Sequence, residues 1–341
     1  MTSQHITISQ HRRPASPHRT RPCRLTRHIR CPSAAPEIRP QPSANTTSTQ
    51  PDTQFAETKH GGVRGASDAP WRASMTVARD WEPDVVLLQE MCSPAGKAAG
   101  LRAHLWRTAN ELGMIPVLGP PTPQTVTANH PAILVSRDLD ILDDGPPLWD
   151  SGGGALPAWC YVLVQVPGLP FPLALYSVHL PARCAQEQQA QAQRLASLMA
   201  QSGAISVAGG DWNCLPPGDY SQDELAAMPE HLRPSRMRTR RRDDGTIELA
   251  ANLAVHETMT GVGLVDLTAS VPAARRDPSE LGTTSVHGGG RIDRDYATDG
   301  VQDAVVRHVQ MATGGSDHHA RLTIMSKTAL AGRLTPREPT P

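Results

Sequence analysis

The chain has 341 residues, with 33 Lys and Arg balanced by 33 Asp and Glu, so its formal net charge at pH 7 is zero. This balance gives no argument for a polyanionic partner. Apolar residues make up 38% and aromatic residues 4%, so we expect a core built from Val, Leu, Ile and Ala. The length allows one large domain or two ordinary ones.

Cysteine spacing and hydropathy exclude further classes of protein. The six cysteines lack the spacing of metal fingers, and we expect mostly free thiols. The sequence contains no run of 18 apolar residues and no apolar segment typical of a secretory signal. We therefore expect no membrane span, and a cytoplasmic location is the default.

The first 50 residues differ in composition from the rest of the chain. Between Met1 and Pro40 there are eight arginines and four histidines but only one acid, Glu37. Such a segment buries too little apolar surface to offset its ordering entropy, so we expect residues 1–50 to be disordered. Two interpretations stay open, a basic arm for anionic surfaces and an unselected extension. We expect a domain over residues 51–326 and a second disordered tail over 327–341.

Apolar runs alternate with amphipathic stretches between these tails, as is typical of an α/β domain. The first strong strand is Asp84–Glu90, and the clearest helix is Arg183–Gln201, which is rich in Ala and Gln. In chain order we expect strands at 84–90, 132–136, 161–166, 173–180, 205–208, 291–297 and 322–325, and helices at 98–112, 183–201 and 252–262.

Polar side chains fall at the ends of these strands. Glu90 closes one strand, His179 closes another, and Asp211 follows a third through Gly209 and Gly210. Strand ends of an α/β sheet are where ligand sites collect, because rigid strands deliver loops to one edge. The complete set comprises Glu90, His179, Asp211, Asn213, Asp293, Asp317 and His318.

These residue types suit one kind of chemistry. Carboxylate and amide oxygens are the ligands that Mg²⁺ prefers. A phosphoester needs its oxygens neutralised, a water activated and the leaving oxygen stabilised, and imidazoles serve the last two purposes. The pattern therefore favours hydrolysis of a phosphoester by an activated water with Mg²⁺ or Mn²⁺ as cofactor.

Five motifs occur in an order that resembles a known superfamily. They are 83–90 (PDVVLLQE), 177–180 (SVHL), 210–213 (GDWN), 291–293 (RID) and 316–318 (SDH). Together they are similar to the endonuclease/exonuclease/phosphatase superfamily, which has the deoxyribonuclease I-like fold. The resemblance implies a four-layer α/β/β/α sandwich in which two mixed sheets pack face to face.

The resemblance also implies roles for the individual residues. Glu90 and Asp317 would be metal ligands, and Asp211 would position or deprotonate the attacking water. Asn213 would contact phosphate or metal, while Asp293 would orient His318. His179 and His318 would contact the phosphate, with His179 as a possible general acid. Each residue taken alone also has a structural interpretation; Asp211, for example, could form only an Asx turn.

The family's first core strand is hard to place in this sequence. It normally ends in an Asn that reaches the metal–phosphate site. The expected region, 52–62, contains no Asn and is a poor apolar strand, with Gln54 as a weak substitute. This gap suggests that the strand is damaged or missing.

Two further candidates for substrate binding lie outside the five motifs. Asn129 lies in a loop, and Arg240 belongs to a cluster of arginines between 233 and 242. The cluster could grip the phosphates of a nucleic acid, or be an exposed loop offset by Asp243 and Asp244.

Nuclease activity on DNA or RNA is the first hypothesis for the function. The alternatives are a phosphatase acting on a small phosphomonoester, inositol phosphate or phospholipid headgroup, and a catalytically weakened binding protein of the same fold. The expected partner is accordingly a nucleic acid or small phosphoester, and no obligate protein partner is evident.

Overall fold

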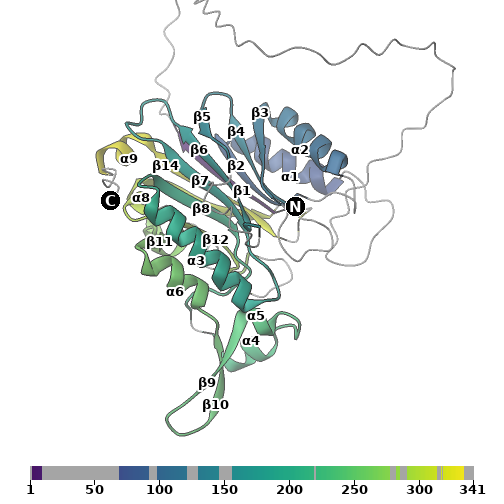
Figure 1. Cartoon of the computed structure of the whole chain (residues 1–341), viewed down its shortest axis with the longest axis vertical. Coiled ribbons are helices and arrows are strands. Elements are labelled where there is room, and N and C mark those ends of the chain that lie inside the picture. The colour runs from purple at the N-terminus through teal and green to yellow at the C-terminus, as the bar shows by residue number, and fades with distance from the viewer. Residues whose placement is uncertain are drawn as a thin grey trace, which may run out of the picture. The chain divides into compact units, whose positions relative to one another are not determined.

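A computed structural model (Figure 1) describes residues 2–9, 69–91, 98–120, 130–145, 156–218, 220–276, 282–284, 290–312, 316 and 318–333. All of these residues belong to one unit of the chain. The strands predicted at 84–90 and 173–180 lie in different sheets of this unit, and each sheet has six strands.

The first sheet is built around the apolar strand β2, Val85–Met91. Its order is β13 (Val305–Ala312), β14 (His319–Ser326), β1 (Thr2–Ser9), β2, β4 (His130–Ser136) and β3 (Met114–Leu118). Only β1 and β14 pair in parallel, and the other neighbours are antiparallel. Residues Val85–Leu88 are fully buried, which is why four apolar residues follow one another in β2.

The second sheet is also mixed. Its order is β11 (Leu264–Asp266), β12 (Asp293–Thr298), β8 (Ile205–Asp211), β7 (Leu173–His179), β6 (Trp159–Gln165) and β5 (Asp140–Asp143). Strands β7 and β8 are parallel and are joined through helix α3, Ala185–Gln201. A parallel pair needs such a crossover, and the helix covers one face of the sheet.

The alternation along β7 shows how the layers pack. Leu173 and Leu175 point into the core between the two sheets, together with Val85 and Leu87 of β2. The alternate side chains, Ala174 and Tyr176, pack instead toward α3 and α6 (Ala254–Gly261). On the other side, α1 (Ala69–Trp81) and α2 (Ala98–Leu112) cover the first sheet. The four-layer α/β/β/α sandwich is therefore confirmed (Figure 1).

The expectation of disorder is wrong for the beginning of the chain. Thr2–Ser9 form β1, which pairs with β2 on one side and β14 on the other. The local pattern, in which Ile6 and Ile8 alternate with Thr7, is typical of a strand, but the arginine-rich residues that follow obscured it. The first core strand is thus present before the region 52–62, where it was sought; residues 51–62 lie outside the described part.

The tail expected after residue 326 is also partly ordered. Lys327–Arg333 form α9, in which Leu330 is buried and the Nζ of Lys327 donates to the carbonyl of Pro167. The remaining elements are α4 (Gln222–Ala226), α5 (Arg233–Arg236), the hairpin β9–β10 (Met237–Arg241 and Ile247–Ala251), α7 (Leu267–Ser270), the 3-10 helix η2 (Ala273–Arg275) and α8 (Val301–Ala304). Among the described residues, no helix has the length and apolarity needed to cross a membrane.

Candidate active site

Strand register brings three of the candidate residues to one edge of the second sheet. His179 pairs with Asp211 across β7 and β8, and Asp293 pairs with Asp211 across β12 and β8. All three side chains are at least 95% buried. They lie side by side because β7 and β8 end, and β12 begins, at the same edge.

Glu90 and His318 come to this edge from the first sheet and complete an alternating row of acids and imidazoles. Glu90 Oε1 lies 3.5 Å from His179 Nε2, which is 3.9 Å from Asp211 Oδ2. Asp211 Oδ2 is 4.0 Å from His318 Nε2, whose Nδ1 is 2.8 Å from Asp293 Oδ2. We call Glu90, His179, Asp211, His318 and Asp293 the acid–imidazole row. Each sheet contributes to it, so the row exists only in the packed sandwich.

The turn that presents Asp211 depends on Gly210. Its φ is +151°, and a Cβ at this position would lie 1.9 Å from the carbonyl oxygen of Val178. No other residue fits between β7 and β8 at this point. Gly210, the first residue of the 210–213 motif, is therefore required for the close approach of the two strands that carry His179 and Asp211.

Glu90 is placed by an irregularity in β2. Its φ is +57°, and the register of β2 against β4 shifts between Leu88 and Met91. A bulge of this kind redirects a side chain that regular pleating would send elsewhere, and positive φ in a non-glycine residue is often found at functional sites. The side chain of Glu90 keeps 15% exposure, more than any other member of the row.

Asn213 is close to the site, but its side-chain amide bonds to other protein groups and not to the row. Its backbone N–H donates to Asp211 Oδ1 at 2.8 Å, which is the Asx turn of the structural interpretation. Its Nδ2 donates to the carbonyl of Leu180, and its Oδ1 accepts from Arg236 Nη2 at 3.4 Å. These bonds, with a φ of +50°, give Asn213 the geometry of a residue that positions Asp211.

The Asp293–His318 pair is held from behind by Thr284. The hydroxyl of Thr284 accepts the backbone N–H of Asp293 at 3.0 Å and that of Ile292 at 3.1 Å. Asp293 Oδ1 is buried and has no hydrogen-bond partner among the described residues, and the same holds for His179 Nδ1. Buried polar atoms usually have a partner, so Asp293 Oδ1 is a candidate contact for a bound cation or water.

The donor set suits a cation. One ligand atom each from Asp211, Asp293 and His318 lies within 4.8 Å of the others. This group differs from the expected metal ligands, since Glu90 is outside it. Two carboxylates, with Glu90 nearby, form an oxygen-rich set appropriate to a hard divalent cation.

Three other residues were predicted for the site: Asp317, Asn129 and Arg240. Asp317 and Asn129 lie outside the described residues. Arg240 lies on β9 of the hairpin, with its side chain 70% exposed and its Nε 3.9 Å from Glu248 Oε1. Figure 1 shows this hairpin projecting away from the sandwich.

Arg236 is a site residue that the sequence did not distinguish. It belongs to the same arginine cluster as Arg240, but it is only 3% exposed, at the end of α5. Burial lowers the pKa of its guanidinium, and the charges of Asp211 and Asp293 act in the opposite direction. Arg236 thus places a positive charge beside the two carboxylates, whereas the arginines from 238 to 242 are exposed on the hairpin.

Comparison with known proteins gives structural similarity alone. No family model matches the sequence, and no curated protein matches it. An endonuclease/exonuclease/phosphatase from Beutenbergia cavernae shares 21% identity over 75% of this chain and 65% of that one, with a TM-score of 0.47. Caenorhabditis elegans TDP2 shares 17% identity over 74% and 89%, with a TM-score of 0.43. An AP endonuclease from Archaeoglobus fulgidus shares 16% over 74% and 93%, with a TM-score of 0.46.

The fold itself is defined by the structure of the chain. Two mixed six-stranded sheets pack face to face between two layers of helices, and motifs from both sheets meet at one edge. This is the architecture that the five motifs implied, and the chain has the deoxyribonuclease I-like fold of the endonuclease/exonuclease/phosphatase superfamily.

Proposed function

We propose that the chain is a metal-dependent phosphoesterase that hydrolyses a phosphodiester through an activated water, with nucleic acid as the first substrate class. The observation that supports this most directly is the acid–imidazole row. Three carboxylates and two imidazoles alternate in it, and each neighbouring pair lies within 4.0 Å. Such a row offers proton acceptors beside proton donors, as general acid–base catalysis requires.

Asp211 is the proposed acceptor of the proton from the attacking water. Its Oδ1 is held by the N–H of Asn213, which leaves Oδ2 facing both imidazoles at 3.9 and 4.0 Å. These separations are longer than hydrogen bonds, so a water or phosphate oxygen placed to one side of such a pair can bond to both groups. Asn213 is assigned to positioning this carboxylate.

His318 is the proposed donor to a phosphate oxygen. Its Nδ1 bonds to Asp293, so Nε2 faces the space beside Asp211. A carboxylate behind an imidazole fixes the ring orientation and stabilises the imidazolium form. His179, whose Nε2 lies between Glu90 and Asp211, is the proposed second donor to the phosphate or leaving oxygen.

Glu90 and Asp317 remain the proposed ligands of Mg²⁺ or Mn²⁺, because Asp211 and Asp293 of the three-residue group described above are assigned to the water and to His318. A bound divalent cation would neutralise the developing charge on the phosphate. The acid–imidazole row would hold the water and the phosphate in position for this reaction.

A covalent enzyme intermediate on Cys214 is disfavoured. This cysteine follows Asn213 directly, but it is 1% exposed and its Sγ accepts from Arg294 Nη2 at 2.6 Å. Burial raises the pKa of the Cys214 thiol, which opposes formation of the nucleophilic thiolate. Direct attack by water therefore agrees better with the chemistry of the site.

Arg240 is the proposed contact with phosphates distant from the reacting one. Side chains alternate along β9, so Arg238 and Arg240 point to the same face of the hairpin, and both are exposed. Exposed arginines on one face suit the backbone of a polynucleotide, since a small phosphoester does not extend so far.

The decisive experiment is a substrate panel with Mg²⁺, Mn²⁺ or EDTA. It includes plasmid DNA, single-stranded DNA, RNA, bis(p-nitrophenyl) phosphate and phosphomonoesters. We expect diester hydrolysis that EDTA abolishes and that His318→Ala reduces on the order of 10²–10³-fold. The matched control is His231→Ala, which changes an exposed histidine of another segment. Hydrolysis of monoesters alone would favour the phosphatase, and no hydrolysis with any metal would favour a binding protein.

A further inference from the structure

A cavity of about 760 Å³ lies beside the acid–imidazole row. Its walls are close in sequence to the catalytic residues. Leu215 follows Asn213 by two residues, Gly290 and Arg291 precede Asp293, and Thr283 precedes the Thr284 that bonds to Asp293. Two residues of chain span at most roughly 7 Å, so Leu215 and Arg291 keep the cavity next to Asn213 and Asp293, which adjoin the position proposed for the phosphate.

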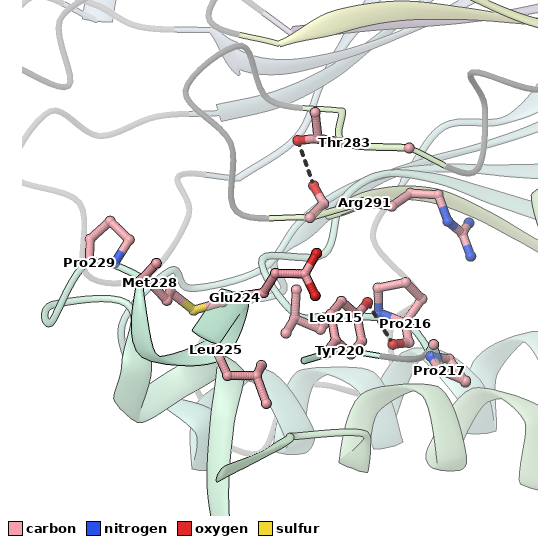
Figure 2. Close-up of a pocket in the computed structure, with 14 residues that line it drawn as sticks. Leu215, Pro216, Pro217, Tyr220, Glu224, Leu225, Met228, Pro229, Thr283 and Arg291 are labelled. Atoms are coloured by element: carbon pink, nitrogen blue, oxygen red, sulfur yellow. Dashed lines mark hydrogen bonds between the residues drawn. The ribbon is translucent and has the colours of Figure 1, made fainter. Parts of the chain in front are cut away.

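The walls of the cavity are largely apolar. Figure 2 shows Leu215, Pro216 and Tyr220 on one side and Leu225 and Met228 on another. The hydroxyl of Tyr220 donates to the carbonyl of Pro216 at 3.0 Å, which fixes the loop against the cavity. Apolar walls of this size are typical of sites that enclose an organic group rather than an ion.

The charged residues around the cavity disfavour binding of an anionic group, such as another phosphate of the substrate. Arg291 contributes to the lining, but Figure 2 shows its guanidinium directed away, where it bonds to Asp266 at 2.9 and 3.1 Å. Asp266 is 4% exposed and neutralises this arginine. The guanidinium of Arg291 is therefore already paired with Asp266 and is not directed at a ligand in the cavity.

Glu224 adds a negative charge on the same side. Its Oε2 accepts from the backbone and hydroxyl of Ser221, which lowers its pKa and keeps the group ionised at neutral pH. Its Oε1 has no hydrogen-bond partner among the described residues. Figure 2 shows this exposed carboxylate next to Leu215. An ionised acceptor that lines the cavity suits an uncharged group that carries N–H donors.

We propose that this cavity binds the organic substituent next to the scissile phosphate, and that it selects an uncharged ring with hydrogen-bond donors such as a nucleobase. Pro217, Tyr220 and Pro229 line the space for the ring, with Leu215 and Met228 buried behind them, and Glu224 accepts from its N–H groups. This inference rests on the proposed function and defines its substrate more narrowly. The enzyme then distinguishes diesters by the group beside the phosphate.

Two diesters with the same leaving group test the proposal. They are deoxycytidine 5′-(p-nitrophenyl phosphate) and methyl p-nitrophenyl phosphate, which lacks the nucleoside. We expect the parent to hydrolyse the nucleoside ester with a kcat/KM at least roughly tenfold higher. Ala227→Trp fills the cavity from an exposed position and should reduce this preference to near one, while leaving the methyl ester unchanged.

Matched controls separate the cavity from its surroundings. Ala226→Trp introduces the same side chain one residue earlier in α4, outside the lining, and should keep the preference. Glu224→Gln should weaken turnover of the nucleoside ester several-fold, whereas Glu230→Gln, on an exposed residue outside the lining, should not. Circular dichroism and melting temperature confirm that each variant is folded.

The outcomes are distinct for the cavity and for the proposed function. Equal kcat/KM for the two esters in the parent, or equal effects of Ala227→Trp and Ala226→Trp, would overturn the cavity proposal while hydrolysis remains. If the parent hydrolyses neither ester, the proposed function fails. Calorimetric titration with deoxycytidine then still tests the cavity proposal. The nucleoside should bind to the parent and to Ala226→Trp but not to Ala227→Trp, and equal binding to both variants would overturn the proposal.

Discussion

Replacing Asp293 with Asn tests whether this carboxylate acts through His318. The two groups are buried and joined by a 2.8 Å contact between Oδ2 and Nδ1. Asn keeps the size and one acceptor but removes the charge that stabilises an imidazolium. Hydrogen bonds to charged groups contribute roughly 1.5–3 kcal/mol, and about 1.4 kcal/mol corresponds to a factor of ten in rate. We therefore expect Asp293→Asn to reduce kcat roughly 10–150-fold.

The assay is steady-state hydrolysis of bis(p-nitrophenyl) phosphate by four proteins: the parent, Asp293→Asn, His318→Ala and the double variant. The backbone near Asp293 should not move, because Thr284 holds the N–H groups of Ile292 and Asp293. If Asp293 acts only through His318, the double variant is no slower than His318→Ala alone. A double variant slowed by the product of the two single effects would show an independent role for Asp293, such as metal binding.

Further predictions concern the metal, the ion pair of Arg291, the hairpin and β1. Glu90→Gln should shift the Mg²⁺ midpoint of the initial rate upward, with partial rescue at high Mg²⁺, since an amide is a poorer ligand; an unchanged midpoint would remove Glu90 from the ligands. Asp266→Asn should lower the free energy of unfolding at pH 7 by about 3–5 kcal/mol, because it leaves the buried Arg291 uncompensated. Burial alone would raise the pKa of Asp266, but the charge and hydrogen bonds of Arg291 outweigh it and hold the pKa below 3.8. The ion pair therefore contributes above that pH and is lost as the pH falls through the lowered pKa, so denaturant melts should show parent and variant converging in acid. Arg240→Ala should raise KM for polynucleotides and reduce their salt dependence without affecting bis(p-nitrophenyl) phosphate; a parallel loss on both substrates would contradict a backbone contact. Ile6→Pro should lower the melting temperature strongly, because β1 pairs on both sides, whereas Thr2→Pro at the first residue of the strand should have little effect; equal melting temperatures would contradict the placement of β1.

The fold was predictable where local pattern and burial agree. Helix α2 has the bounds that its sequence indicated, and β2 and β7 lie within a residue or two of the predicted ranges. β1 was missed because only Ile6 and Ile8 are apolar in it, and its stability depends on pairing with strands far along the chain. Long-range pairing of this kind leaves little trace in a local window.

The candidate site was predictable as a set of residue types but not as a set of contacts. Strand ends located Glu90, His179 and Asp211, because β7 and β8 bring His179 and Asp211 together and the packing of the two sheets adds Glu90. The hydrogen bonds of the Asn213 side chain to Leu180 and Arg236 could not be predicted, since they depend on where α5 packs. Nothing in the run of arginines distinguishes the buried Arg236 from its exposed neighbours.

The parallel pairing of β1 with β14 has a consequence for the order in which the protein folds. Gln4 pairs with Arg321, so this contact joins residues more than 300 positions apart. Strands β5 to β8 of the second sheet, by contrast, lie between residues 140 and 211 and assemble from neighbours in sequence. During translation the second sheet can form early, whereas β1 has only β2 to pair with until β14 leaves the ribosome. Nascent chains shorter than 326 residues thus expose an unpaired edge of β1, and this edge is where we expect chaperone binding or aggregation to begin.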